Sequence, residues 1–196
     1  MPDQLDAGQR ALLERAEAFV HDRLVPLTDA HGDAPAELRR RVVAASREAG
    51  FFAMTQPAAL GGSEASVLEL VIVREALARI ALSVREDVFG PGAGVLAGAT
   101  GELRAEYLEP LIRGEKRGAF AFTDARETRT VAVPDGDSWR LTGVKSYVTG
   151  GAEADFFTVV ARLAAAGGTP GRGAVLLVVD RDADGLEISA PFRSMD

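Results

Sequence analysis

The chain reads GAFAFTD at residues 118–124, WRLTGVKSYVTGG at 139–151 and ADFFTVVARL at 154–163. These segments are rich in β-branched and aromatic residues, alternate over short stretches with a period of two, and are separated by glycines. The pattern predicts a run of β-strands. Two threonines, Thr123 and Thr149, stand at predicted strand ends beside aromatic residues.

More strands are expected around this run. The Asp135-Gly136-Asp137 sequence predicts a hairpin turn between strands at 131–133 and 139–141. Residues 174–179 are nearly all apolar, which is typical of a strand covered on both faces. Residues 186–190 are predicted to form a last strand. From residue 118 onward the chain therefore has the pattern of a β domain.

The residues before 118 have the periodicity of helices instead. Apolar residues recur at helical spacing in four stretches, and Pro26 is predicted to end the first of them. The expected helices lie at residues 12–24, 35–49, 67–82 and 100–114. The third stretch is apolar nearly all round, so it is expected to be buried on most sides. Asp6 with Gln9, and Ser66 with Glu69, have the spacing of helix capping boxes.

The composition excludes several classes of protein. The chain has 196 residues, is 47% hydrophobic and carries a formal net charge of −7, so nucleic acid is not an expected partner. It has no uncharged apolar run of membrane-spanning length, and the acidic residues 1–6 do not resemble a signal peptide, so no membrane association is expected. The absence of cysteine removes disulfides and thiolate chemistry, and it fits a cytoplasmic protein.

Three polar or glycine-rich features have a functional and a structural interpretation. The two histidines, His21 and His31, lack the spacing of a metal site, and we expect no metal. The glycine-rich residues 89–94 can be taken for a phosphate loop, but their spacing fits none, and close helix packing is the simpler interpretation. The run Arg39-Arg40-Arg41 can bind an anion or simply be a solvated helix face, which the negative net charge favours.

Several motifs, taken in order, resemble the acyl-CoA dehydrogenase family. No single motif is specific to the family, but the number and order of the motifs are specific. Together the motifs cover essentially the whole chain. The matching segments are residues 50–57 with 61–63, 101–104 with 107–111 and 114–115, 120–124, 141–150, 154–155 and 184–186.

The resemblance implies an α+β fold with two domains in this chain. Residues 1–117 would form an N-terminal all-α helical domain, and residues 118–196 an incomplete antiparallel β-barrel or sandwich that faces a flavin. A second helical domain, which carries the catalytic carboxylate in the family, is absent from the sequence, so no catalytic residue is assigned. The chain would be a fragment or one subunit, inactive alone, of an FAD-dependent enzyme. That enzyme would catalyse α,β-dehydrogenation of an acyl thioester of CoA or of a carrier protein.

The resemblance also implies which residues contact the flavin. One edge would be lined by Phe120, Ala121, Phe122 and Thr123. Another would be lined by Tyr147, Val148 and Thr149. Strand alternation places Tyr147 and Thr149 on one face and Val148 on the other, so Tyr147 can pack on the ring while Thr149 donates a hydrogen bond to it. The alternative is that Tyr147 is an ordinary half-exposed strand aromatic and that Thr123 and Thr149 are ordinary strand residues.

The sequence departs from the family directly after Asp124. The family has a glycine- and serine-containing loop here that contacts the FAD diphosphate, whereas this chain has only the short segment 125–130 before its next strand. Arg126 or Arg129 can offer a charge to a phosphate, although a solvated loop is the simpler interpretation. FAD affinity is therefore expected to be weak. The alternative function is a non-redox module that binds an acyl carrier or a partner protein. In either case we expect a homo- or hetero-oligomer, because open strand edges associate.

Overall fold

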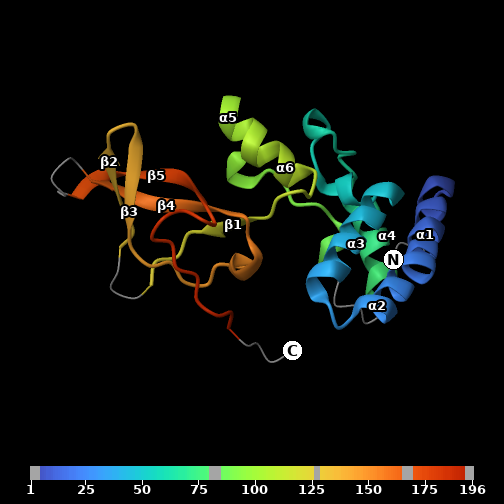
Figure 1. The fold of residues 1–196 in the computed structure, drawn as a ribbon. Helices are drawn as coiled ribbons and strands as arrows, with labels where there is room; N and C mark the ends of the chain where they lie inside the picture. The colour runs from blue at the N-terminus through green and yellow to red at the C-terminus, as the bar shows by residue number, and fades with distance from the viewer. Residues whose placement is uncertain (1–4, 80–84, 126–128, 165–169, 193–196) are drawn as a thin grey trace. The chain divides into compact units, whose positions relative to one another are not determined.

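The computed structural model describes residues 5–79, 85–125, 129–164 and 170–192 (Figure 1). The chain divides into two compact units. The helical unit comprises the residues up to Gly94 together with 112–114, and the sheet unit comprises residues 95–111 and those from 115 onward. This confirms the α+β class, with helices before strands. The boundary expected between residues 117 and 118 stays a prediction.

Among the described residues, the helical unit is built from four main α-helices. They are α1 (Ala7–Phe19), α2 (Val25–His31), α3 (Pro35–Ala49) and α4 (Val67–Ala78). Helix α1 packs on α4, and α2 packs on α3. The core between them contains Ala16, Phe19, Val20, Leu24, Leu38, Val42, Ala45, Phe51, Met54, Val73, Ala76, Leu77 and Val88.

The prediction that Pro26 ends the first helix is wrong. Residues Val20–Leu24 form a π-helical turn that leads directly into α2, in which Pro26 occupies the first turn. In this turn the N–H of Val25 bonds to the carbonyl of Val20, five residues back. A proline in a regular helix lacks one hydrogen bond and clashes with the carbonyl four residues earlier. The wider turn accommodates it, and the chain stays helical to His31.

Both predicted capping boxes are confirmed. The Asp6 carboxylate accepts from the Gln9 N–H at 2.8 Å, and the Gln9 side chain accepts from the Asp6 N–H at 3.0 Å. Ser66 and Glu69 make the same reciprocal pair at the start of α4. These bonds satisfy N–H groups that the first turn of a helix leaves unpaired.

Helix α4 is less buried than its sequence predicts. Ile72, Val73, Ala76 and Leu77 lie in the core, whereas the side chain of Val67 is 79% exposed. One apolar side of the helix therefore faces solvent within its own unit. The end of the predicted helix, residues 80–82, lies outside the described residues.

The glycine-rich segment after α4 packs closely, as the structural interpretation predicts. The Gly90 N–H donates to the Phe52 carbonyl at 2.7 Å. A Cβ at position 90 would lie 2.4 Å from the Gln56 amide nitrogen, so no other residue fits there without displacement. Gln56 is itself buried and donates to the Ile112 carbonyl at 2.9 Å.

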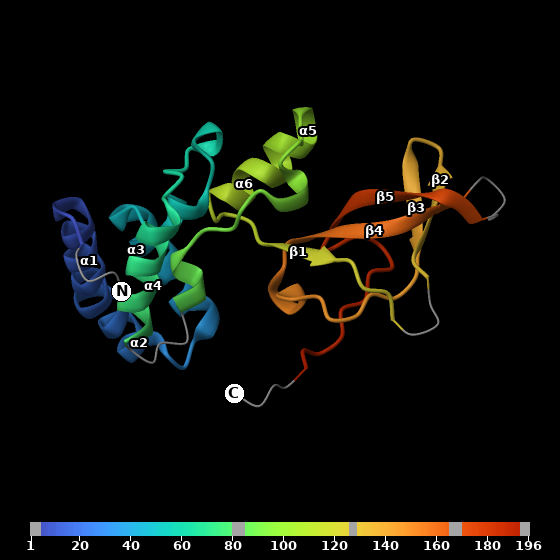
Figure 2. The same cartoon turned by 180° about the vertical axis from the view of Figure 1, so that it is seen from behind.

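The sheet unit contains a five-stranded sheet preceded by a helical segment. The helical segment comprises α5 (Gly101–Leu103), a π-helical turn (Arg104–Leu108) and α6 (Glu109–Ile112). The strands are β1 (Gly118–Ala121), β2 (Val131–Asp135), β3 (Ser138–Thr142), β4 (Phe156–Ala164) and β5 (Pro170–Asp180). The order along the sheet is β1-β4-β2-β3, with β5 paired to β4, as Figures 1 and 2 show.

The sheet is mixed rather than purely antiparallel, which corrects the expected pairing. Strand β4 runs parallel to both β1 and β2, and antiparallel to β5. The long connections between β1 and β4, which include the β2–β3 hairpin, allow the parallel pairings. The hairpin itself is confirmed, with Asp135 opposite Ser138 and Gly136 at a positive φ of 62°.

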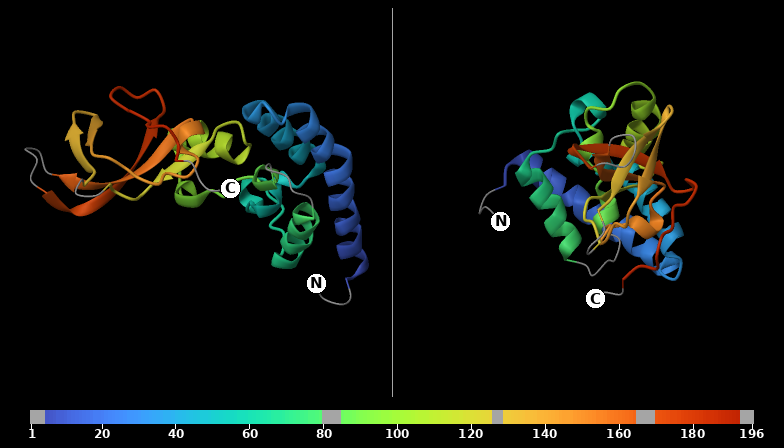
Figure 3. Two further views of the ribbon diagram at one scale, coloured as in Figure 1. Left: turned by 90° about the horizontal axis from the view of Figure 1, so that it is seen from below. Right: turned by 90° about the vertical axis from the view of Figure 1, so that its left-hand side faces the viewer.

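The last part of the chain differs from the prediction in two ways. The described side chains of β5, from Gly173 to Asp180, are exposed or half-buried, so this strand is not covered on both faces. Residues 186–192 follow as extended chain without a strand, visible as the red coil in Figure 3. An apolar sequence alone does not form a strand, because a strand needs a neighbour for its backbone groups.

One face of the sheet holds a core cluster of this unit. It contains Ala119, Ala121, Ala154, Phe157 and Val159, against which Val148 and Val179 pack. Phe120 pairs with Thr158 in the register and therefore points to the opposite face. At the last residue of β5, the Asp180 carboxylate accepts from the Tyr107 hydroxyl at 2.9 Å. Burial and this carboxylate raise the pKa of Tyr107 to about 12, which keeps the phenol a hydrogen-bond donor.

Candidate functional site

The structure brings the two predicted flavin-contacting segments together. The Ser146 N–H donates to the Thr123 carbonyl at 2.9 Å, and the Ala125 N–H donates to the Val144 carbonyl at 2.9 Å. Asp124 and Lys145 form an antiparallel bridge between these bonds. Residues about twenty positions apart in the sequence therefore share one edge of the sheet unit.

The predicted residues divide into those that support this edge and those that face solvent. Ala121 is buried, and Val148 is half-buried against the same core. Phe122 is 62% exposed, although aromatic side chains are normally buried. The side chains of Phe120, Thr123, Tyr147 and Thr149 are exposed as well. The rings of Phe120 and Phe122 lie 5.8 Å apart.

Tyr147 is the most unusual residue of the edge. Its backbone has a φ of 57°, which is uncommon for any residue other than glycine. Residues 146–148 lie outside the strands, and Thr149 begins a turn, so the expected alternation of Tyr147, Val148 and Thr149 does not apply. The Tyr147 side chain is 78% exposed, and its ring stacks on Phe192 at 5.6 Å.

A charged network, which the sequence does not predict, lies directly beneath the edge. The Lys145 ammonium donates to the Phe122 carbonyl at 2.9 Å and to Asp124 at 2.7 Å. The same carboxylate oxygen of Asp124 accepts from the hydroxyl of Thr130 at 2.7 Å and from its N–H at 3.1 Å. Nothing in the periodicity signals this network, because it depends on the pairing of residues 122–125 with 144–146.

The network sets the charge of Asp124. Burial raises the pKa of this carboxyl, but the hydrogen bonds from Lys145 and Thr130 together outweigh burial and hold the pKa below its ordinary value. Asp124 is therefore ionised at neutral pH, and it neutralises the Lys145 ammonium. The Lys145 side chain is only 11% exposed, so the pair belongs to the structure of the edge more than to its surface.

A surface hollow of about 410 Å³ adjoins the edge. It is lined by Phe122, Thr123, Asp124, Thr130, Lys145, Val160, Ala161, Arg162, Gly173 and Ala174. Its walls are mostly apolar with a few polar groups, as in small-molecule sites. Tyr147 and Thr149 do not line it. Of the two loop arginines considered from the sequence, Arg129 is exposed and Arg126 lies outside the described residues.

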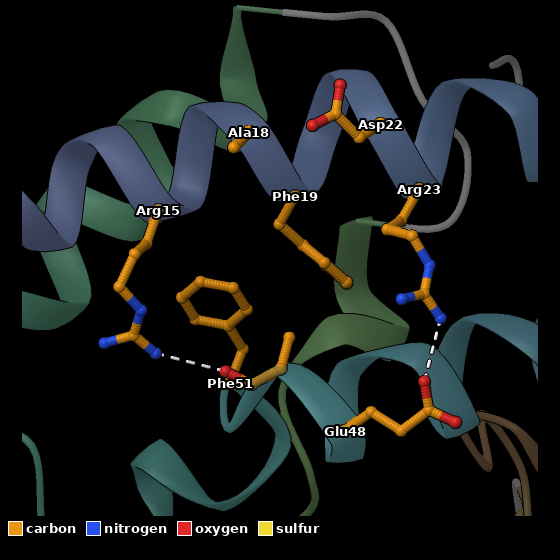
Figure 4. A pocket seen from close by; sticks show the side chains of 8 residues that line it. Arg15, Ala18, Phe19, Asp22, Arg23, Glu48 and Phe51 are labelled. Carbon is orange, nitrogen blue, oxygen red and sulfur yellow. Dashed lines mark hydrogen bonds and ion pairs between the residues drawn. The ribbon is translucent and has the colours of Figure 1, made fainter.

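A second hollow of about 410 Å³, in the helical unit, has a structural explanation (Figure 4). The Arg15 guanidinium donates to the Ala49 carbonyl at 3.1 Å, at the end of α3 where carbonyls lack partners. Arg23 pairs with Glu48 at 2.8 Å across the same space. These side chains bridge two helices over the buried ring of Phe51, and their charges are balanced within the hollow.

The described residues hold neither a cluster of metal ligands nor a membrane-spanning helix. No group of three or more histidine, cysteine, aspartate or glutamate residues comes together there as metal ligands. In the same part of the chain, no helix has the length and apolarity needed to cross a bilayer.

Comparisons with known proteins agree with the fold and with the motifs. Residues 6–115 match the family model of the acyl-CoA dehydrogenase N-terminal domain, and residues 120–195 match that of the middle domain. A 3-(aryl)acrylate reductase of Clostridium sporogenes is 31% identical over 92% of this chain and 50% of its own length.

Solved structures show the same relationship. A putative acyl-CoA dehydrogenase of Mycobacterium smegmatis is 30% identical, with a TM-score of 0.72 over 97% of this chain and 52% of that chain. A glutaryl-CoA dehydrogenase of the same species, solved in complex with FADH2, shares the fold with a TM-score of 0.70 at 23% identity, over 97% and 50% of the two chains. The chain spans about half the length of these relatives. With family models that together match most of its residues, this chain belongs to the acyl-CoA dehydrogenase family.

Proposed function

We propose that this chain provides the helical part and the flavin-facing sheet of an FAD-dependent oxidoreductase that acts on the Cα–Cβ bond of an acyl thioester. The observation that carries the proposal is the pairing of residues 123–125 with 144–146. It joins the segment that carries Phe122 and Thr123 to the segment that leads into Tyr147 and Thr149, in a chain of this family.

The residues at this edge fit a flavin. An isoalloxazine ring has flat apolar faces and a rim of hydrogen-bonding atoms, so it needs aromatic surfaces and nearby donors. Phe122 and Tyr147 offer exposed rings, and Thr123 and Thr149 offer exposed hydroxyls. FAD, when bound, would supply the acceptor for the hydride that leaves the β-carbon of the substrate.

The proposed roles follow from burial and position. The hydroxyls of Thr123 and Thr149 donate hydrogen bonds to the flavin rim and stabilise the negative charge of its reduced form. The ring of Tyr147 packs against the flavin. Ala121 and Val148 support the edge from within the sheet core and leave contact with the ring to their neighbours.

The substrate and the partners are proposed at the level of chemical class. The substrate is an acyl thioester carried by CoA or by a carrier protein. The relatives include an enzyme named a reductase and others named dehydrogenases, so the same bond can be oxidised or reduced within the family. Because this chain spans half of its relatives, we propose that turnover requires further residues, from the same gene product or from an associated chain.

A second candidate is a module without redox chemistry that binds an acyl carrier or a partner protein. Two observations favour it. The connection from Asp124 to β2 is short and carries arginines in place of the glycines and serine of the family loop. One face of Tyr147 is also already occupied by the Phe192 ring.

Titration of the purified chain with FAD, followed by flavin fluorescence, separates the two candidates. We expect weak but saturable binding, and no oxidation of an acyl-CoA by the chain alone with an artificial electron acceptor. Thr149→Val should weaken FAD binding by about 1 kcal/mol, the scale of one hydrogen bond. Thr142→Val, at an exposed position on β3, is the matched control and should change nothing. No FAD binding at millimolar concentration, together with binding of an acylated carrier protein, would support the second candidate instead.

A further inference from the structure

We propose that Lys145 is the positioning residue of this edge: it holds Thr123 and Tyr147 in place without touching the flavin. This inference rests on the proposed function, because it assigns a role to a side chain behind the flavin-contacting residues. Lys145 is nearly buried, and its ammonium points to the backbone and carboxylate of the neighbouring segment rather than to solvent.

The first step of the argument is the bond to the Phe122 carbonyl. Lys145 donates to this carbonyl at 2.9 Å, one residue before Thr123. The residue after Lys145 is also anchored, because the Ser146 N–H donates to the Thr123 carbonyl at 2.9 Å. The position of Thr123 is therefore fixed by two hydrogen bonds. The Lys145 side chain binds the carbonyl of the preceding residue, Phe122, and the Ser146 N–H binds the carbonyl of Thr123 itself.

The second step connects Lys145 to the sheet. Its partner Asp124 accepts two hydrogen bonds from Thr130, and the Thr130 carbonyl accepts from the Arg162 N–H on β4 at 2.9 Å. The chain of contacts runs from Lys145 through Asp124 and Thr130 to a central strand. A hydrogen-bond network of this kind holds a site more rigidly than a single loop can, because each group is fixed by its partner.

The third step is the backbone of Tyr147. A positive φ at a tyrosine costs on the order of 1–3 kcal/mol and persists only where the surroundings impose it. Tyr147 follows Lys145 and Ser146 directly, so both anchors of the segment lie within two residues of it. Strained, exposed aromatic residues of this kind are typical of ligand contacts.

The test uses the full chain and three variants of its two lysines, Lys145 and Lys116. Lys145→Met keeps the length of the side chain but removes the ammonium. It should raise the dissociation constants for FAD and for FMN by the same factor, about tenfold, the scale of one charge-assisted hydrogen bond. Lys116→Met, whose lysine lies over the Tyr107 ring at 4.9 Å, should leave both constants unchanged. Lys145→Arg should restore most of the affinity.

Hydrogen exchange provides a readout that does not need the flavin. In Lys145→Met, the amides of Ser146 and Ala125 should exchange about tenfold faster, because their bonds lose the support of the network. Amides of the helical core should be unaffected. If Lys145→Met does not fold, as followed by Trp139 fluorescence, Asp124→Asn replaces it and should give a smaller change in the same direction.

The outcomes distinguish the inference from the proposed function. If the wild-type chain binds no flavin, the proposed function fails, and the role assigned to Lys145 fails with it. If the wild type binds FAD, but Lys145→Met binds it equally well and exchanges its amides at the same rate, the role of Lys145 is overturned while the proposed function stands. An affinity lost in Lys145→Met and not restored in Lys145→Arg would also contradict positioning by hydrogen bonds.

Discussion

The aromatic residues in the core of the helical unit and those at the candidate site of the sheet unit occupy opposite environments. In the helical unit Phe51 is 1% exposed and packs on Phe19 with the ring centroids 5.0 Å apart. In the sheet unit Phe120 and Phe122 lie at the surface, although Phe120 belongs to β1, which borders a buried core. Rings that a fold needs for its core are buried, whereas exposed rings at strand ends are available for binding.

The largest expected effect tests this contrast with one substitution in each unit. Phe51→Ala removes a buried ring and leaves a cavity, which typically costs about 3–5 kcal/mol of unfolding free energy. Phe122→Ala removes an exposed ring and should cost about 0.5 kcal/mol or less. Urea unfolding followed by circular dichroism measures both. A large loss in Phe122→Ala would show that this ring supports the fold, which would remove it from the proposed flavin contacts.

The helical unit could be predicted well because its signals are local. The capping boxes of Asp6 and Ser66 and the glycine after α3 each depend on residues within one turn of a helix. The two errors arose where a local rule was overridden. A π-helical turn accommodates Pro26, and Val67 is exposed although α4 is apolar nearly all round. The sequence of a single helix does not determine where a π-helical turn forms. It also does not determine which side of α4 other residues cover.

The sheet could be predicted only in part, because strand pairing is not local. The hairpin at Gly136 follows from a two-residue turn, and it is confirmed. The parallel pairing of β4 with β1 and β2 depends on residues far apart in the sequence. The same is true of the candidate site: the resemblance pointed to Thr123 and Tyr147, but the Lys145–Asp124 pair becomes visible only once their segments lie side by side.

An intermediate effect compares a carboxylate paired with a nearly buried lysine in the sheet unit with a carboxylate paired with exposed arginines in the helical unit. Hydrogen bonds from Lys145 and Thr130 hold the pKa of Asp124 below its ordinary value. A carboxyl with a lowered pKa in the folded state contributes stability above its unfolded pKa, and the contribution is lost as the pH falls through the folded pKa. Asp124→Asn should therefore cost about 1 kcal/mol at pH 7, and the difference from wild type should shrink below about pH 4.

The matched variant in the helical unit is Glu37→Gln. Hydrogen bonds from Arg40 and Arg41 lower the pKa of Glu37, but the side chains of these arginines are 70% and 50% exposed, so solvent screens the pair. Its substitution should have a smaller effect than that of Asp124. Urea unfolding at several pH values, with Trp139 fluorescence as the probe, measures the dependence for Asp124, and circular dichroism measures it for Glu37. Equal effects of the two substitutions would contradict the supporting role of the Lys145–Asp124 pair.

The smallest expected effect concerns the stack of Phe192 on Tyr147. Both rings are mostly exposed, so Phe192→Ala should change the unfolding free energy by less than about 0.5 kcal/mol. The same substitution frees one face of Tyr147, and it should tighten FAD binding by about threefold, since an aromatic stack of modest strength no longer competes with the flavin. Leu186→Ala, in the same terminal segment but without a ring, is the control for both measurements.

A stability loss above about 1 kcal/mol would make the stack part of the fold, as the buried pair of Phe19 and Phe51 is. An unchanged FAD affinity would mean that the flavin uses the other face of Tyr147, the face that Phe192 already leaves open.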